Sequence, residues 1–512
     1  MSDRLLISAP APASSGAVSR PSSPQGVYLP ILLTCAAFLL LYTRSLIGPV
    51  IFFDDFQILT QSWTWQRTCD GLWVPQNEHA MPLGRLFCFA LEWLAGRLPL
   101  LPLLTCLVGP LALLLGLWLL YVFVRREMGH SFYALLAIVL FAVTSVYHQA
   151  VWWFAASFAV LAMDTMLLGL LAAQRWRQRG GHLDLLLCLL ACLLAPGWFA
   201  LGILAGPLCC LYLLPYLVSR DPKGSAGLSR APLRDAAKQI GLCLLPLAGT
   251  ALFLAVSLPR TSDAILHTYH YGDQTAVEAF QPLVGLEYTA RSLVDNLLLG
   301  LAGVSNVALP DWCVVVILPV MVAVGVWWWR QARDRRLMLL GVGLIGSAYM
   351  LCYSARALWP YSQMVEPSFA RYHLLPHLGL VLFFCGGLPA RSGSWLSLDA
   401  TGALTARQRG FLYGLIAVCF LVQLPRGLLC ASPTGWDQFT EVRAQQAALR
   451  RIEEVETRCR RNHISSAAAR QALDRLDVPL SLNVIDGWDF LVGSDDPRPR
   501  PPEEVRRFLE AP

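Results

Sequence analysis

Charged residues are scarce in this chain. They make up 14% of its 512 residues, whereas a soluble globular domain carries about 25%. Hydrophobic residues make up 56%, the mean hydropathy is +0.51, and apolar runs of about 20 residues, the length that crosses a bilayer, recur along the chain. This shortage of charge excludes a soluble enzyme and predicts an all-α polytopic membrane protein.

Three common sequence signatures are also missing. The chain has no Gly-rich phosphate fingerprint after a strand, no pair of cysteines at CxxC spacing and no basic stripe on a soluble surface. These absences exclude a nucleotide-binding loop, a zinc or thiol-redox site of that type, and a nucleic-acid partner. Most of the 15 cysteines lie inside apolar runs, where they serve as small hydrophobic residues.

Basic residues concentrate in a few short connectors, which sets the predicted orientation. The net charge is +6, and Lys and Arg cluster at Arg125–Arg126, Arg175–Arg179, Arg220–Lys238 and Arg330–Arg336. Short loops rich in Lys and Arg stay on the cytoplasmic side of a membrane. We therefore expect about 11 spans, with the amino terminus in the cytoplasm and the carboxyl terminus outside.

The predicted spans follow from this orientation, with two ambiguities. Only Pro196-Gly197 separates two of them, so this pair is either a tight external turn or one broken helix. The apolar patch 293–309 is interrupted by Gly300 and Gly303, so it is either a half-helix that dips in from the outside or a further span. The spans lie near residues 28–47, 100–124, 131–147, 150–173, 183–196, 198–218, 240–258, 312–329, 337–353, 372–389 and 411–429.

The chain divides into three parts. Residues 1–27, rich in Pro, Ser and Ala, read as a disordered cytoplasmic amino terminus. Residues 28–429 form the membrane domain, whose first external loop covers 48–99. Residues 430–512 form a small soluble external tail, in which Asn483–Val492 reads as a hairpin around Asp-Gly. The tail carries no catalytic motif, so we expect it to support the membrane domain.

Two adjacent acids, Asp54 and Asp55, follow the first span directly. Ionised carboxylates beside hydrocarbon are costly, because desolvation disfavours the charge and the two groups repel each other. No Lys or Arg lies within a few positions of them. They are either solvated acids that end the span or a catalytic or metal-binding pair.

A short apolar segment follows in the same loop. Met81–Pro99 is too apolar to lie in water and too short to span the membrane. A helix in the outer interface fits it better, with Arg85 and Arg97 directed to lipid head groups. Pro82-Leu83 opens this helix.

The order of these motifs resembles the GT-C superfamily of polyprenyl-phosphate-sugar-dependent integral membrane glycosyltransferases. The likeness is greatest to the protein O-mannosyltransferase-like branch and its bacterial relatives, in which paired acids in the first loop precede a Pro-Leu. Gln149–Trp153 is similar to the acid-Ala-Val-x-Trp opening of a later span in that branch, with Gln149 in place of the acid. Residues 30–175 carry the resemblance well, and the rest carries it only in architecture.

A second cluster lies where an external loop meets the tenth span. Arg371-Tyr372 resembles the Arg-Tyr that stands at this point in many such transferases. A guanidinium can bind a phosphate through two parallel hydrogen bonds. Arg371 is therefore either a phosphate ligand or a side chain that extends to the interface beside Tyr372.

The resemblance implies inverting sugar transfer from a polyprenyl-phosphate donor to an unidentified acceptor at the outer face of a bacterial inner or plasma membrane. Asp54 or Asp55 would act as general base, and the other would orient the acceptor or hold Mg²⁺, Mn²⁺ or Ca²⁺. Arg371 and Tyr372 would bind the substrate. The remaining candidates for the substrate site are Arg85, Arg44, Glu78 and His79.

The alternative function is that of a polytopic transporter or lipid flippase. Such proteins also have many spans and broken helices, and they carry acids near the middle of the membrane. Asp164 is the one notable acid well inside a predicted span, and no clear internal repeat is visible.

Overall fold

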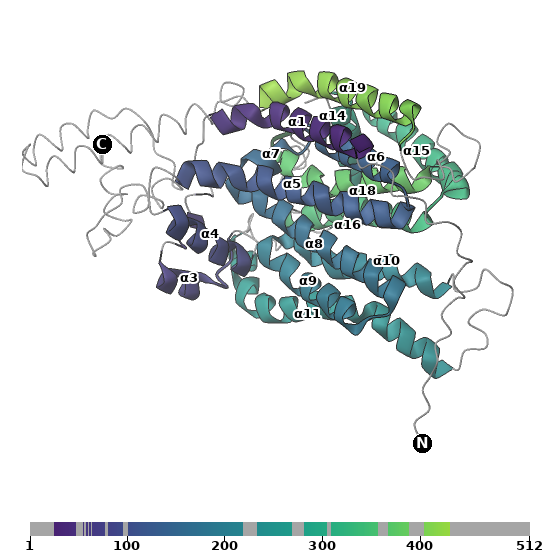
Figure 1. The fold of residues 1–512 in the computed structure, drawn as a ribbon. Helices are drawn as coiled ribbons and strands as arrows, with labels where there is room; N and C mark the ends of the chain where they lie inside the picture. Colours follow the sequence, from purple (N-terminus) through teal and green to yellow (C-terminus); the bar gives the residue numbers. More distant parts are fainter. Residues whose placement is uncertain are drawn as a thin grey trace, which may run out of the picture.

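The computed structural model describes residues 25–47, 55, 58–59, 61–62, 64–76, 80–95, 101–218, 233–268, 281–304, 309–356, 367–388 and 404–430. Within these ranges the chain is helical and contains no strand, which confirms the all-α class (Figure 1). Asp54, Glu78, His79, most of the amino terminus and the tail from residue 431 lie outside the described residues.

The helices follow one another with short breaks. In chain order they are α1 (Gln25–Ile47), α3 (Trp65–Gly71), α4 (Pro82–Ala95), α5 (Leu101–Met128), α6 (Ser131–Ala142), α7 (His148–Trp152), α8 (Phe154–Arg179), α9 (His182–Trp198), the 3₁₀ turn η1 (Ala200–Leu204), α10 (Ala205–Val218), α11 (Leu233–Thr268), α13 (Pro282–Arg291), the π-helix η2 (Ser292–Leu298), α14 (Leu299–Leu301), α15 (Asp311–Gln331), α16 (Arg335–Arg356), the 3₁₀ turn η3 (Pro367–His373), α18 (Leu374–Gly387) and α19 (Ala406–Cys430).

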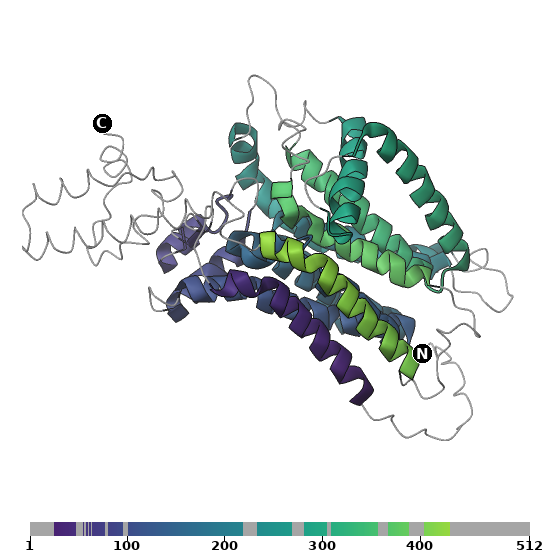
Figure 2. The ribbon, with the colours of Figure 1, turned by 90° about the horizontal axis from the view of Figure 1, so that it is seen from above.

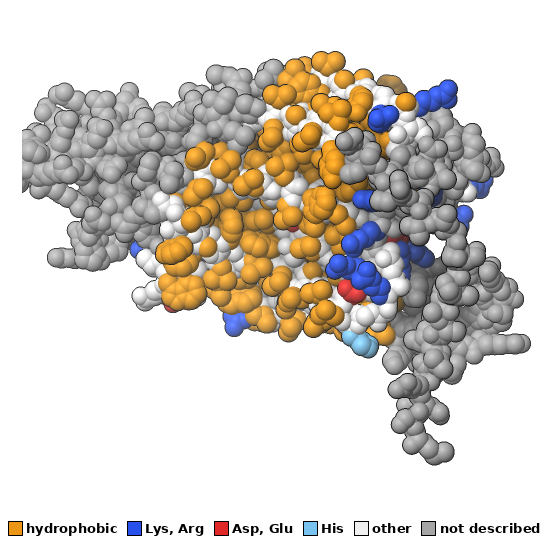
Figure 3. Space-filling model, viewed as in Figure 1, with side chains coloured by type: hydrophobic (Ala, Val, Ile, Leu, Met, Phe, Trp, Pro, Cys, Tyr) orange, Lys and Arg blue, Asp and Glu red, His pale blue; other side chains and the backbone are white. Residues whose placement is uncertain are grey.

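Six of the described helices, α5, α8, α11, α15, α16 and α19, are long and apolar enough to cross a membrane. Hydrophobic side chains cover most of the face in Figure 3, and Lys and Arg gather at one end of it. We call this end, which carries Arg125, Arg126, Arg177 and Arg179, the basic end. The helices α1 and α19 lie side by side along one edge of the bundle (Figures 1 and 2). The predicted count of 11 spans stays a prediction.

A buried polar network joins three helices at the basic end. Glu127 of α5 accepts hydrogen bonds from Gln174 Nε2 at 2.8 Å, Arg177 Nη2 at 2.8 Å and Tyr212 Oη at 2.7 Å. The donors belong to α8 and α10, and the Glu127 side chain is only 2% exposed. One carboxylate thus fixes the mutual positions of α5, α8 and α10.

Pro196 and Gly197 do not separate two helices as predicted, because both lie inside α9 and the chain turns just after Trp198. The chain turns tightly through η1, where a Cβ atom on Gly202 would lie 2.1 Å from the Ala195 carbonyl oxygen. Beyond the turn, Thr250 Oγ1 accepts from Gly206 N at 3.2 Å and donates to Cys192 O at 3.3 Å. The helices α9 and α10 therefore form a hairpin against α11 rather than one broken helix.

The segment from α13 to α14 turns back instead of crossing the bundle. Gly303 adopts a positive φ of 81°, and the turn is closed by Val304 N to Leu299 O at 2.9 Å and Gly303 N to Gly300 O at 3.0 Å. This is the Schellman arrangement that ends a helix, and glycine suits its left-handed residue because it has no Cβ atom.

Polar contacts hold Leu309 and Asp311, which follow the turn, beside Asp295 and Arg291, which precede it. Leu309 N donates to Asp295 Oδ1 at 3.3 Å, and Arg291 pairs with both Asp295 and Asp311. The first residue of α15 thus lies next to the last residue of α13. The helix that includes residues 293–301 thus ends at Gly303, and the chain is back beside Asp295 at Leu309; whether this segment dips into the membrane or spans it stays a prediction.

The helix α6 is much shorter than α5 and α8, between which it lies in the chain. With 12 residues, α6 covers roughly 18 Å, whereas α8 has 26 residues and covers roughly 39 Å. The non-helical residues 143–147 complete the connection from α6 to α7, and all of them are buried. Irregular backbone at membrane depth persists only where protein surrounds it or where it lines a cavity. This break is therefore enclosed by other helices.

Glu127→Ala leaves the three donors that converge on this carboxylate without their acceptor inside the bundle. Breaking a buried charged network costs about 3 kcal/mol or more, so we expect a clearly lower thermal-unfolding midpoint in detergent. Arg126→Ala, a change of an exposed neighbour on the same helix, is the control and should leave the midpoint unchanged. Equal midpoints for both variants would show that the network does not hold the three helices.

Candidate functional site

The start of α8 holds one of the two predicted acids. Trp153 has an extended backbone (φ −91°, ψ 118°) that separates α7 from α8. The first N–H groups of a helix have no partner within the helix, and the helix dipole places partial positive charge there. Asp55 Oδ1 accepts the N–H of Ala155 at 2.7 Å, and Asp55 is 1% exposed. The helix start supplies the positive partner that the neighbouring sequence lacks.

Arg371 lies against the other end of the same short segment. Its backbone N–H and its Nη1 both donate to Gln149 Oε1 at 3.4 Å. The guanidinium lies over the rings of Trp153 at 4.9 Å and Tyr372 at 4.7 Å, and Nη2 donates to Tyr372 Oη at 3.3 Å. Gln149, which stands where the resembling enzymes have an acid, therefore contacts Arg371 directly.

Three motifs that are distant in sequence thus meet on residues 149–155. Asp55 comes from the first loop, and Arg371 from the loop before α18. The residues they contact, Trp153 and Ala155, are two positions apart, so their Cα atoms lie within about 8 Å of each other. This convergence is the geometry that a shared site requires.

The expected orientation of Arg85 is wrong. The helix α4 begins at Pro82 as predicted, but Arg85 is 1% exposed instead of reaching lipid head groups. Its Nη2 donates to Val74 O at 2.8 Å, while Nε and Nη1 have no hydrogen-bond partner among the described residues. The reason is helical spacing: Arg85, Cys88 and Glu92 share the face of α4 that is turned inward.

Glu92 is a buried acid that the sequence analysis missed. It is 7% exposed, and neither carboxylate oxygen has a hydrogen-bond partner in the described part of the chain. Burial raises the pKa of Glu92 to about 9. Asp55, Arg85 and Glu92 all act electrostatically on Cys88, so Asp55 lies near this face of α4. The sequence signal was the seven-residue spacing from Arg85, which puts both residues on one face.

A second missed residue is Arg426, near the end of α19. It is 6% exposed, and its charge acts on both His148 and His373. Nδ1 of His148 lies 3.0 Å from Ser145 O, and Nδ1 of His373 lies 2.9 Å from Tyr349 Oη. These contacts fix the orientation of both rings. The sequence signal was a basic residue inside the last apolar run.

The remaining predicted residues have the following places. Tyr372 is buried beside Arg371. Arg44 belongs to α1, and its side chain lies outside the described residues, as do Asp54, Glu78 and His79. The predicted cation site on the acid pair therefore stays a prediction. Among the described residues, the group with metal-ligand proximity is Cys188, Cys192 and Cys209, whose sulfur atoms lie within 4.8 Å of one another between α9 and α10.

Comparison with known proteins adds no relative. No protein-family model matches this chain, and no curated protein matches it.

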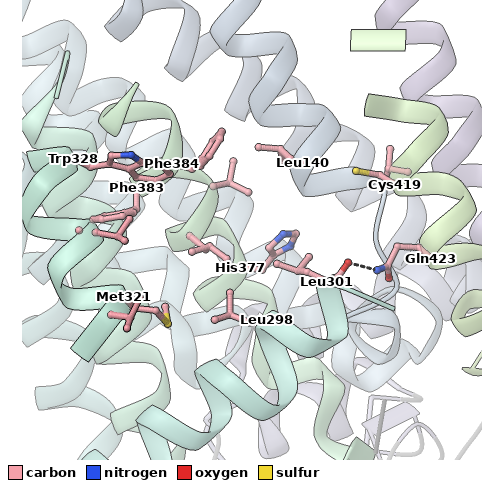
Figure 4. Close-up of a pocket in the computed structure, with 16 residues that line it drawn as sticks. Leu140, Leu298, Leu301, Met321, Trp328, His377, Phe383, Phe384, Cys419 and Gln423 are labelled. Atoms are coloured by element: carbon pink, nitrogen blue, oxygen red, sulfur yellow. Dashed lines mark hydrogen bonds between the residues drawn. The ribbon is translucent and has the colours of Figure 1, made fainter. Parts of the chain in front are cut away.

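An apolar cavity of about 500 Å³ lies between α6, the segment η2–α14, α15, α18 and α19. Hydrophobic side chains line it almost entirely, and its polar lining residues are His377 and Gln423. Figure 4 shows His377, Leu301 and Gln423 together, with Trp328 and Phe383 farther along the lining. Gln423 Nε2 donates to Gly300 O and Leu301 O at 2.9 Å, which closes the end of α14. A cavity of this size and lining suits a hydrocarbon chain.

Glu92→Gln tests the buried acid on α4. Because the pKa of Glu92 is about 9 in the fold and near 4.5 in the unfolded chain, the folded state holds the proton more tightly between these values. Stability should therefore fall as pH rises through this window, by roughly 1 kcal/mol per pH unit. The variant, which cannot lose that proton, should lose less stability between pH 5 and pH 8. Unfolding midpoints at the two pH values measure this, and identical slopes would contradict a neutral Glu92.

Proposed function

We propose that the protein is an integral membrane glycosyltransferase that transfers a sugar from a polyprenyl-phosphate donor to an acceptor at the outer face of the membrane. The observation that carries the proposal is that Asp55 and Arg371, predicted to belong to one site, contact the same segment of chain. A base and a phosphate ligand must both reach one donor sugar, so their proximity is the first requirement of the reaction.

The acid pair supplies the base in this proposal. A carboxylate takes the proton of the acceptor hydroxyl while the phosphate leaves the anomeric carbon. Because Asp55 is already bound to the start of α8, we assign it the role of fixing the first loop against the bundle. Asp54 then takes the proton, or the pair shares a divalent cation through its carboxylate oxygens.

Arg371 has the role of binding the donor phosphate as it gains charge. Stacking on Trp153 and Tyr372 holds the plane of its guanidinium, which limits the reorganisation needed when a phosphate arrives. Gln149 contacts Arg371 without adding a negative charge, whereas an acid at that position would compete with the phosphate.

The membrane setting supports a lipid donor. Asp55 and Arg371 contact the α7 end of α8, opposite the basic end, and this end becomes the outer face if the positive-inside rule holds. We propose 11 spans with the amino terminus in the cytoplasm and the carboxyl terminus outside. In this arrangement the apolar cavity gives a lipid chain a place beside the site.

A transporter or lipid flippase is the second candidate, and one residue favours it. Asp164 of α8 is 3% exposed, and neither of its carboxylate oxygens has a hydrogen-bond partner among the described residues. Unpaired acids inside a span are typical of ion and proton pathways. Sugar transfer by the purified wild-type protein would decide for the transferase.

Asp54→Asn should lower kcat for sugar transfer by about a hundredfold or more, because the base is lost. The assay is turnover of a polyprenyl-phosphate sugar by purified protein. Asp55→Asn keeps an oxygen for the Ala155 N–H and should have the smaller effect. Asp70→Asn, an exposed acid of the same loop, is the control. Unchanged turnover in both the Asp54 and Asp55 variants would refute the mechanism.

Arg371→Gln should lower kcat/KM for the donor by about tenfold or more, because a charged hydrogen-bonded contact to phosphate is lost. Arg371→Lys keeps the charge without the paired donors, so it should retain part of the activity. Arg330→Gln, an exposed change at the basic end, serves as the matched control. Equal kcat/KM in the Lys and Gln variants would show that the charge does not act on the donor.

A further inference from the structure

Arg426 is a buried cation without a counter-ion. Its Nε and Nη1 have no hydrogen-bond partner, and it takes part in no ion pair among the described residues. A charge taken out of water is costly unless it is paired or binds an ion. The acid of the neighbouring helix η2, Asp295, is already paired with Arg291. The described part of the chain therefore supplies no anion to the Arg426 guanidinium.

The fold leaves space for this side chain instead of excluding it. A Cβ atom on residue 300 would lie 2.3 Å from Arg426 Nη1, so the guanidinium packs directly against Gly300 and would have to shift if a larger residue stood there. The carbonyl groups at the end of α14 already accept from Gln423. Arg426 is thus not needed to close α14.

Two histidines complete the surroundings. His148 and His373 bind Ser145 O and Tyr349 Oη through Nδ1, so the Nε2 atom of each ring is on the opposite side. Both rings feel the charge of Arg426. Because Ser145 O is a carbonyl, Nδ1 of neutral His148 is the donor and its Nε2 is an acceptor, so the guanidinium of Arg426 supplies the N–H donors that phosphate oxygens prefer.

The apolar cavity begins one helical turn away. On α19, Gln423 precedes Arg426 by three residues, and on α18 His377 follows His373 by four, so each pair shares one face of its helix. Gln423 and His377 are the polar lining residues of the cavity (Figure 4). An amphiphilic anion would therefore place its charged head group at Arg426 and its apolar tail in the cavity.

We propose that Arg426 binds the phosphate group of a lipid whose chain lies in the cavity between α15, α18 and α19. Binding of the lipid phosphate does not require sugar transfer. That the bound lipid is a substrate rests on the proposed function. This site is separate from the contacts of Arg371 with Gln149 and Trp153.

Binding of dodecyl phosphate to the full-length protein in phosphatidylcholine nanodiscs tests the site. The rise of the unfolding midpoint with ligand concentration gives Kd. Arg426→Gln should weaken binding by about tenfold or more, because it removes the charge while keeping an amide donor. Arg409→Gln, an exposed change on the same helix, should leave Kd unchanged. Without ligand, the Arg426 variant should be at least as stable as wild type, because a buried unpaired charge is gone.

Two further arms make the result decisive. Val324→Trp, which fills the cavity and leaves Arg426 intact, should also weaken binding of dodecyl phosphate. Inorganic phosphate and dodecylphosphocholine should stabilise the protein much less than dodecyl phosphate does. Equal protection by inorganic phosphate would mean a free anion site, and an unchanged Kd in Arg426→Gln would overturn the proposal. Unchanged turnover in Asp54→Asn and Asp55→Asn with intact dodecyl phosphate binding would overturn the proposed mechanism alone, whereas loss of turnover in Asp54→Asn with no effect of Arg426→Gln on Kd would overturn the lipid site alone.

Discussion

The break between α6 and α8 is the constraint on which the rest of the site depends. Residues 143–147 leave the helix at a depth where no water can bind their backbone groups, so the protein must do so. Gln423 accepts from Ser145 N and Oγ at 3.0 and 2.9 Å, and it donates to the end of α14. One amide thus joins α19, the break and α14, and it brings together segments that are almost 300 residues apart in sequence.

The break also explains why charged groups collect around α7. Interrupting the helical run exposes the first N–H groups of α8, and Asp55 binds one of them. The break also turns Gln149 toward Arg371 and places His148 where the charge of Arg426 acts on it. The first loop, the loop before α18 and the last helix therefore all meet at one short segment. Membrane enzymes and transporters both use such interruptions, so the fold alone does not select between them.

The sequence predicted the fold class and several local features. Apolar length gave the helices, Pro82 marked the start of α4, and Gly300 with Gly303 marked an interruption where the helix ends. The same reasoning failed for Arg85, because hydrophobicity alone does not tell which face of an interfacial helix is buried. Glu92 was missed for the same reason: its lack of a partner depends on what α4 packs against.

The sequence by itself predicted a polytopic membrane protein and singled out Asp55 and Arg371 as candidate site residues, because hydrophobic length and local motif order are properties of the chain. Only the tertiary structure decided that these two residues contact one segment, that Arg426 pairs with no acid in the described part of the chain, and that an apolar cavity opens beside Gln423. Each of these facts depends on contacts between helices distant in sequence. No local pattern encodes which buried charge finds a partner, since the partner is fixed by packing.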